Sequence, residues 1–204
     1  MLTATELIGA RVCLEPISAE ILPELTRVAL SVPEVWTHFA IPMRNDSEIE
    51  RTVTHALERQ RAGEWAVFAT RLAGARELIG GTSVRVVDRA VPSVEIGGTW
   101  IVPRWQRTAV NTEAKLLQLT HCFEQLGCQR VELKTDVRNL RSQAAIARIG
   151  ASREGVLRAH MRRPDGSLRD SVLFSMLASE WPEHRERLRA RLARGESEAG
   201  AAAR

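Results

Sequence analysis

The sequence has no tyrosine, only three cysteines and only two lysines, Lys115 and Lys134. Without tyrosine, no phenolic hydroxyl can serve as an acid. Cys13, Cys122 and Cys128 lack the spacing of metal ligands, and their odd number argues against a disulfide framework. We therefore predict reduced, mostly buried thiols and no metal site.

Long apolar runs are also missing. No stretch approaches the ~20 apolar residues of a membrane span, and the N-terminus has neither the basic nor the apolar region of a signal peptide. These absences predict a cytoplasmic protein without a membrane partner.

Because lysine is scarce, nearly all of the positive charge is arginine, and the formal net charge is +4. An arginine-rich chain can bind nucleic acid or the ribosome, so a module of that kind stays open. The arginines are spread along the chain, which favours an ordinary solvated surface and makes a nucleic-acid partner unlikely.

The length of 204 residues suits one domain. We assign it to residues 1–181, followed by an arginine-rich helix and a flexible tail over residues 182–204. The helical spacing of Leu188 and Leu192 supports the helix, and the small polar residues from Gly195 support the tail.

The stretch 94–142 organises the chain. Residues 94–102 predict a strand, in which Gly97 and Gly98 indicate a bulge or a close ligand. A loop then leads to a helix from Thr112, with Asn111 as the expected N-cap, and free N–H groups at such a helix start suit a phosphate. A strand at 130–135 and a helix at 140–149 complete a βαβ pattern.

The flanking segments predict further elements. Their ranges are a strand at 11–15, a helix from the cap Ser18 to Leu30, a helix from the cap Ser47 to Ala62, a hairpin of 65–71 with 78–87, and a late strand pair of 155–161 with 170–177.

Two motifs carry a family resemblance. Gln106 to Asn111 stands where an acyl-CoA pyrophosphate loop has Gln or Arg, two variable residues, Gly, any residue, and Gly or Ala; here Ala109 replaces the glycine. Asn139 and Ser142 form an Asn-x-x-Ser run before a short helix that ends at Gly150. In this order, with the late strand pair and Glu180-Trp181, the motifs resemble the GNAT superfamily of acyl-CoA N-acyltransferases, in its Rim-type, ribosomal-protein N-terminal acetyltransferase-like branch.

The resemblance implies a single-domain α/β fold with a central mixed, mostly antiparallel, splayed sheet of about seven strands flanked by helices. It also implies that acetyl-CoA, or another short acyl-CoA, is the co-substrate. The residues that it assigns to the acyl-CoA site are Trp100, Ile101, Val102, Gln106, Arg107, Thr108, Ala109, Val110, Asn111, Thr112, Asn139 and Ser142. We predict an ordinary backbone conformation at Ala109.

For catalysis, the resemblance implies an acid for the leaving thiolate and a base for the acceptor amine. Many relatives use a tyrosine seven residues after the asparagine, but Ile146 stands there, so the role falls to Ser142. A serine at this position can instead only bond the first helical turn. Glu95 is the candidate base, acting through water, although a strand carboxylate is more often the partner of an arginine.

Trp36, His38 and Phe39 are the candidates for one wall of the acceptor pocket, or they merely close the core. The acceptor implied by the Rim-type resemblance is a peptide or protein N-terminus, with a small amine as the alternative. A CoA-binding protein without turnover remains a third reading. Dimers are common among the relatives, which leaves a homodimer open, and the sequence does not determine the oligomeric state.

Overall fold

The computed structural model describes residues 2–202, with side chains as far as Arg194. Its centre is an eight-stranded sheet of order β1-β2-β3-β4-β5-β6-β8-β7, in which only β5 and β6 pair in parallel. The strands are β1 (Leu7–Ile8), β2 (Val12–Pro16), β3 (Trp65–Leu72), β4 (Leu78–Asp88), β5 (Ser93–Ile101), β6 (Arg130–Asp136), β7 (Ser152–Arg162) and β8 (Leu168–Leu177). The expected mixed, mostly antiparallel sheet is confirmed, with one strand more than the seven predicted.

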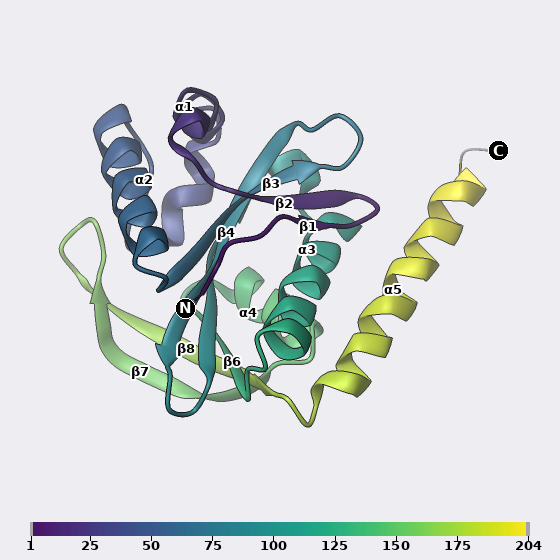
Figure 1. Ribbon diagram of the computed structural model, residues 1–204. Helices are drawn as coiled ribbons and strands as arrows, with labels where there is room; N and C mark the ends of the chain where they lie inside the picture. The colour runs from purple at the N-terminus through teal and green to yellow at the C-terminus, as the bar shows by residue number, and fades with distance from the viewer. Residues whose placement is uncertain (1, 203–204) are drawn as a thin grey trace.

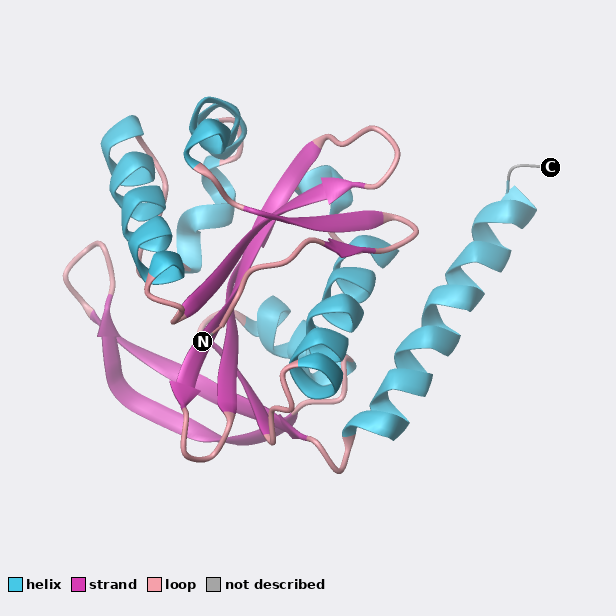
Figure 2. Ribbon diagram, in the orientation of Figure 1, coloured by secondary structure: helices cyan, strands magenta, loops and turns pink. Residues whose placement is uncertain are grey.

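Helices cover both faces of the sheet. They are α1 (Leu22–Leu30), α2 (Asp46–Arg61), α3 (Ala109–Thr120), α4 (Leu140–Arg148) and α5 (Trp181–Ala202), with short 3-10 turns η1 (Ala19–Ile21), η2 (Pro33–His38) and η3 (Pro103–Trp105). Figures 1 and 2 show α1 and α2 together on one side and α3 with α5 on the other. The parallel pair β5 and β6 is joined through α3, so the predicted βαβ unit is confirmed.

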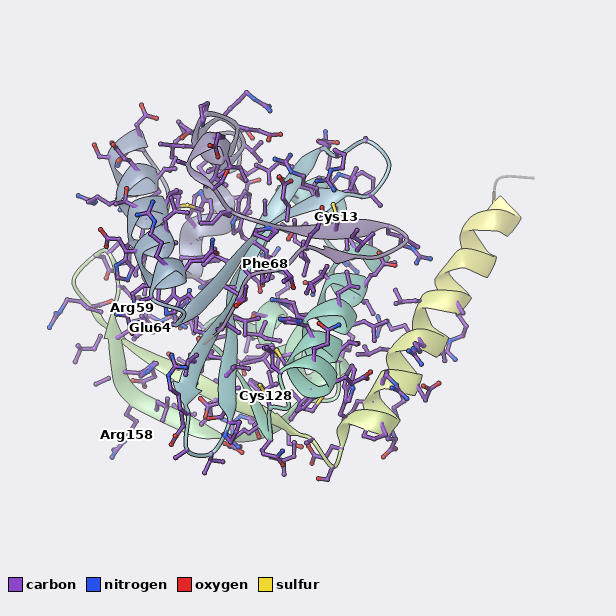
Figure 3. The ribbon with its side chains drawn as sticks, viewed as in Figure 1. Cys13, Arg59, Glu64, Phe68, Cys128 and Arg158 are labelled. Atoms are coloured by element: carbon purple, nitrogen blue, oxygen red, sulfur yellow. The ribbon has the colours of Figure 1, made fainter. Side chains whose placement is uncertain are left out.

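The core lies on both sides of the sheet. Phe68, Leu14 and Leu119 are among its largest fully buried side chains on the side of α3, and Ile49 of α2 is fully buried on the other side. Figure 3 shows Phe68 near the middle of the sheet, whereas Arg158 on β7 points away from the molecule. The cysteines are free and buried, as predicted.

Three predicted helix caps are wrong. Ser18 makes no capping hydrogen bond, and a 3-10 turn precedes α1. Asn45 rather than Ser47 caps α2, because its side chain accepts the Glu48 N–H at 2.9 Å. Thr108 rather than Asn111 caps α3, accepting the Val110 N–H at 3.3 Å. Several capping residues stand close together in each segment, and only the tertiary position of the helix selects between them.

The C-terminal helix runs to Ala202, past the expected end at Arg194, and residues 203–204 lie outside the described part. Leu188 and Leu192 are buried, and Trp181 stacks on Phe123 with ring centroids 5.5 Å apart. The start of α5 thus packs on the domain. Whether 1–181 and 182–204 behave as separate units stays a prediction. Among residues 2–202, no helix is long and apolar enough to span a membrane.

Candidate active site

The sheet opens between its fifth and sixth strands in spatial order, β5 and β6. β5 pairs with β6 only through Ser93 with Arg130, Val94 with Val131 and Glu95 with Glu132. From Ile96 onward, β5 no longer pairs with β6. The expected splay is therefore present, and it leaves backbone groups of β5 facing an open space.

A cleft of about 1310 Å³ occupies this opening and continues from the start of α3 to the turn η2. Most of the predicted site residues line it: Trp36, His38, Phe39, Glu95, Trp100, Ile101, Gln106, Arg107, Thr108, Asn111, Thr112, Asn139 and Ser142. Val102, Ala109 and Val110 do not line it. Val102 and Val110 are buried, with 7% and 3% of their surfaces exposed.

One end of the cleft is the N-terminus of α3. Helix geometry leaves the first N–H groups without an intrahelical partner, and only that of Val110 is capped, by Thr108. Such N–H groups and the helix dipole favour a phosphate. Arg107 has φ 63°, whereas Ala109 has no positive φ, so the predicted ordinary conformation at Ala109 is confirmed.

The donor set at this end fits an acyl-CoA. The Asn111 Oδ1 atom is buried and has no hydrogen-bond partner among the described residues. Buried polar atoms in proteins normally have hydrogen-bond partners. A buried acceptor without one, close to the free N–H groups of a helix start, is expected where a polar ligand supplies the missing bonds. Gln106 is already engaged: its Nε2 donates to Ile101 O at 2.8 Å, and its Oε1 accepts from Arg141 Nη1 at 2.6 Å.

Along β5, the Val102 N–H is not free. It donates to Ile79 O at 2.8 Å. We expected one of the N–H groups of Trp100, Ile101 and Val102 to polarise a thioester, and the Val102 N–H is not available for this, because strand β4 already takes that donor. Trp100 and Ile101 remain as candidates.

Helix α4 begins at the cleft with its predicted motif. Asn139 Oδ1 accepts the Ser142 N–H at 3.0 Å, so Asn139 is the N-cap of α4. The Ser142 side chain lines the cleft, and its hydroxyl has no hydrogen-bond partner among the described residues. The hydrogen bond from this hydroxyl to the first helical turn, which a purely structural role would require, is therefore not present among the described residues. Ile146, where relatives have tyrosine, also lines the cleft.

Glu95 lies where β5 and β6 part. Its Oε2 accepts from Lys134 Nζ at 3.0 Å, so its cationic partner is a lysine rather than the arginine that we expected. A Cβ on Gly97 would come within 2.7 Å of Glu95 Oε1, and Gly98 has φ +60°. The two glycines therefore let the chain bulge beside the carboxylate, as predicted.

The aromatic wall is partly core and partly cleft. Trp36 is 3% exposed, and its Nε1 donates to Ala29 O at 3.1 Å. Its ring lies 5.1 Å from that of Trp100 and 5.2 Å from that of Phe39. Both proposed roles of these residues, closing the core and lining the cleft, are compatible with this packing.

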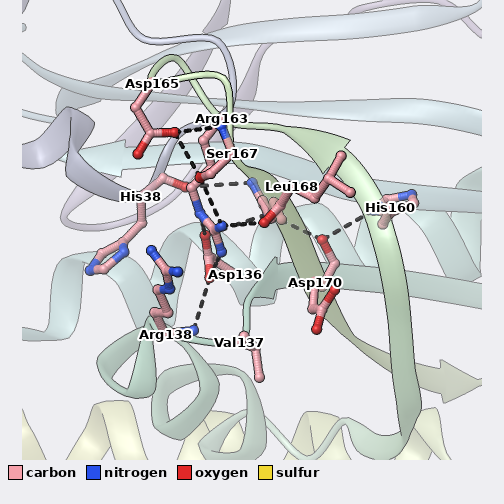
Figure 4. A network of polar contacts seen from close by, with 12 residues as sticks. His38, Asp136, Val137, Arg138, His160, Arg163, Asp165, Ser167, Leu168 and Asp170 are labelled. Atoms are coloured by element: carbon pink, nitrogen blue, oxygen red, sulfur yellow. Dashed lines mark hydrogen bonds and ion pairs between the residues drawn. The ribbon is translucent and has the colours of Figure 1, made fainter.

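Asp136, at the end of β6, ties three segments together. It is 1% exposed and accepts from Arg163 Nε at 2.9 Å and from the Arg138 N–H at 2.9 Å (Figure 4). Burial opposes its charge, but the bonds from Arg163 and Arg138 hold the pKa of Asp136 below its usual range. Arg169 lies 3.9 Å from the same carboxylate and donates to His38 O, so the β7–β8 hairpin contacts the acceptor wall.

The sequence does not single out Arg85, Lys115, His160 and Arg169, which also line the cleft. Burial lowers the pKa of Arg85, His160 and Arg169. Burial also lowers the pKa of Lys115 to about 7. For Arg85 a signal existed, because it pairs across the β4–β5 hairpin with Glu95; the others depend on tertiary packing.

Comparison with known proteins identifies the architecture. Residues 11–152 match the family described as "Acetyltransferase (GNAT) domain". The chain is 30% identical over 168 residues to "Putative ribosomal N-acetyltransferase YdaF" of Bacillus subtilis (strain 168), covering 82% of this chain and 90% of that protein. A GCN5-related N-acetyltransferase from Brucella melitensis superposes with a TM-score of 0.83 at 29% identity, over 92% of this chain and 85% of that one.

The fold is also that of Mycobacterium smegmatis RimJ, solved in complex with CoA-disulfide, with a TM-score of 0.75 at 24% identity and 88% coverage of both chains. The family and relative matches favour acyl transfer over CoA binding without turnover and over a nucleic-acid module. The chain therefore belongs to the GNAT acetyltransferase family and is an acetyl-CoA-dependent N-acetyltransferase.

Proposed function

We propose that the protein acetylates the N-terminal amine of a protein, with a ribosomal protein as the first candidate. Support comes from the relative YdaF, which carries the name of a ribosomal N-acetyltransferase, and from the size of the cleft. At about 1310 Å³ the cleft exceeds the range of about 300–1,000 Å³ that is usual for a single small ligand. That volume leaves room for a peptide end beside the donor.

On the donor side, free N–H groups at the start of α3 and the Arg107 side chain bind the pyrophosphate. Asn111 and Thr112 line the same end of the cleft. The pantetheine arm lies along the unpaired edge of β5, and an N–H of Trp100 or Ile101 polarises the thioester carbonyl. The binding of CoA-disulfide by Mycobacterium smegmatis RimJ supports this assignment.

On the reaction side, Glu95 accepts a proton from the acceptor ammonium through a water molecule. The neutral amine then attacks the thioester carbonyl, the carbon–sulfur bond breaks, and Ser142 donates its hydroxyl proton to the departing sulfur. The serine oxygen recovers a proton from the nitrogen of the new amide, which must lose its second proton. The observation that carries the mechanism is the unpartnered Ser142 hydroxyl at the wall of the cleft. Trp36, His38 and Phe39 form the acceptor wall in this proposal.

An acceptor screen tests the proposal. The protein is incubated with acetyl-CoA and, separately, succinyl-CoA, together with peptides that begin with different residues, and each mixture is read by mass spectrometry. We expect a mass increase on peptide N-termini. Blocked N-terminal peptides that still carry lysine are the matched control.

If only polyamines, amino acids or aminoglycosides gain the acyl group, the acceptor is a small amine. Release of free CoA without any acylated amine would contradict transfer to an amine altogether. We also propose a cytoplasmic location and a homodimer; light scattering at several protein concentrations measures the second.

A further inference from the structure

Arg85 lies on the acceptor side of the cleft and takes no part in the steps above. Its guanidinium carbon sits 4.3 Å from the centre of the Trp65 ring, and its Nε donates to Ser83 Oγ at 3.0 Å. Trp65 and Arg85 face one another across strands β3 and β4. An arginine stacked in this way presents the outer edge of its guanidinium, with its two Nη groups, to a ligand.

No carboxylate within the described residues lies within 4.0 Å of this guanidinium. Glu95, which lies on β5 directly opposite Arg85, forms its ion pair with Lys134 instead. Arg169, a buried arginine of the cleft, has Asp136 at 3.9 Å, whereas Arg85 is half-buried. Burial lowers the pKa of Arg85, and the charge of Glu95 on the neighbouring strand opposes this shift without cancelling it.

The distance between the Arg85 guanidinium and the thioester site determines how far the negative group of a ligand must lie from its reacting amine. A Cβ on Gly98 would lie 3.1 Å from Arg85 Nη2, so the fork lies above that glycine. Trp100 follows two residues later, which at about 3.3 Å per residue places it roughly 7 Å along the strand. The start of α3 is several residues further on, so Arg85 is not a pyrophosphate ligand.

The separation of roughly 7 Å between the Arg85 guanidinium and the Trp100 region distinguishes two kinds of acceptor, a free amino acid and a peptide. In a free amino acid the amine and carboxylate share one carbon atom, which is too short a link. Consecutive Cα atoms of a peptide are about 3.8 Å apart, so the side chain of its second or third residue spans the gap. The planar fork of arginine pairs with a carboxylate through two parallel hydrogen bonds.

We infer that Arg85 selects acceptors that carry an aspartate or glutamate at the second or third position of the N-terminus. The inference rests on the proposed transfer to peptide N-termini and names the chemistry of the preferred peptide. Arg85 is then a specificity residue that supplies no proton and contacts no thioester.

The test compares C-terminally amidated peptides that differ only at position 2 or 3, with Asp, Glu, Asn, Gln or Lys there. A further peptide has Gln at that position and a free C-terminal carboxylate. It shows whether Arg85 recognises the C-terminal carboxylate instead of an acidic side chain. The wild-type enzyme should show a kcat/KM for the acidic peptides at least about tenfold above that for their amide counterparts.

Arg85→Met keeps an apolar stem against Trp65 and removes the charge. It should lower kcat/KM for the acidic peptides by about tenfold or more and leave the amide peptides nearly unchanged, which also shows that the variant is folded. Arg85→Lys retains the charge without the fork and should fall between the two.

Equal rates for acidic and amide peptides with the wild-type enzyme would overturn the inference alone. An equal loss on both peptide classes in Arg85→Met would overturn it too, because it would reveal a structural role. A preference that follows only the C-terminal carboxylate would contradict the assigned reach. If no peptide reacts while small amines do, the proposed function itself fails and the inference falls with it.

Discussion

Lys115 is a buried amine with no carboxylate partner among the residues that the structure describes, and its charge should weaken the fold at neutral pH. It is 5% exposed, and its Nζ donates to Gln118 Oε1 at 2.6 Å, Thr99 Oγ1 at 2.7 Å and Thr82 Oγ1 at 3.2 Å. These neutral oxygens stabilise an ammonium less than a carboxylate would. Burial therefore lowers the pKa of Lys115 from 10.5 to about 7.

The sign of the pH effect follows from this shift. Between pH 7 and pH 10.5 the unfolded chain holds a proton on Lys115 that the folded chain has released. The free energy of unfolding therefore rises with pH across this window, by about 1 kcal/mol per pH unit. Below pH 7 both states are protonated, and the full cost of burying the charge remains.

Lys115→Met removes the titrating group and preserves a side chain of similar length. The remaining polar atoms keep partners, since Thr82 Oγ1 lies 2.8 Å from Thr99 Oγ1 and 3.2 Å from Gln118 Oε1. We expect the stability of the wild type minus that of the variant to rise by about 2 kcal/mol from pH 7 to pH 9.

Urea denaturation at half-unit pH intervals measures this difference. The pKa of the buried Cys122 thiol is raised and the Lys115 charge opposes this rise, so Cys122→Ala is introduced into both proteins before they are compared, and no tyrosine titrates in either. Lys134→Met is the matched control: the bonds of Lys134 to Glu132 and Glu95 outweigh its burial and raise its pKa, so its contribution is constant from pH 7 to pH 9 and is lost only at higher pH. A flat difference for Lys115→Met over the same range would refute the reasoning.

Four further outcomes are expected. Ser142→Ala should lower kcat by about ten- to a thousandfold with little change in acetyl-CoA binding or melting temperature, since the proton is needed only as charge develops on sulfur; an unchanged kcat removes Ser142 from the mechanism. Ala109→Gly should change CoA affinity little, because Ala109 has an ordinary helical conformation, and a gain above tenfold by calorimetry would contradict this. Glu113→Gln should destabilise the fold by about 2 kcal/mol in urea, because the Glu113 carboxylate accepts the N–H groups of Ala10, Arg11 and Val12; an unchanged midpoint would count against that role. Deletion of residues 195–204 should leave the melting temperature unchanged, whereas deletion of 182–204 should lower it by exposing the surface under Leu188, and equal effects of both would oppose the proposed division.

The sequence predicts the elements of this fold well where the signal is local. The hairpin of β3 and β4 has alternating runs around Gly74, and the unit from β5 to β6 has its strand, loop and helix in order. The mixed, mostly antiparallel sheet and its splay follow from the family resemblance, and the strand order is not predicted, because pairing between distant strands leaves no local pattern.

The candidate site divides in the same way. Asn139 and Ser142 stand in a recognisable motif, and both line the cleft. The bond from the Val102 N–H to Ile79 and the burial of Lys115 are invisible in the sequence, because both depend on neighbours from other strands. A lysine on a helix is ordinarily solvated, but α3 is covered by the sheet on one side and by α5 on the other.

Because β5 and β6 pair over only three residues each, the sheet consists of two parts, β1–β5 and β6–β8, that are joined by this short pairing, here called the seam. Side chains hold the seam at both ends of the cleft: Gln106 bonds Arg141 beside α3, and Arg169 bonds His38 beside η2. Gln106, Arg141 and His38 lie in a loop, at a helix start and at the end of a 3-10 turn, and Arg169 lies near the start of β8. The width of the cleft therefore depends on these side-chain contacts. A single substitution at either end of the cleft can change this width while every strand keeps its register.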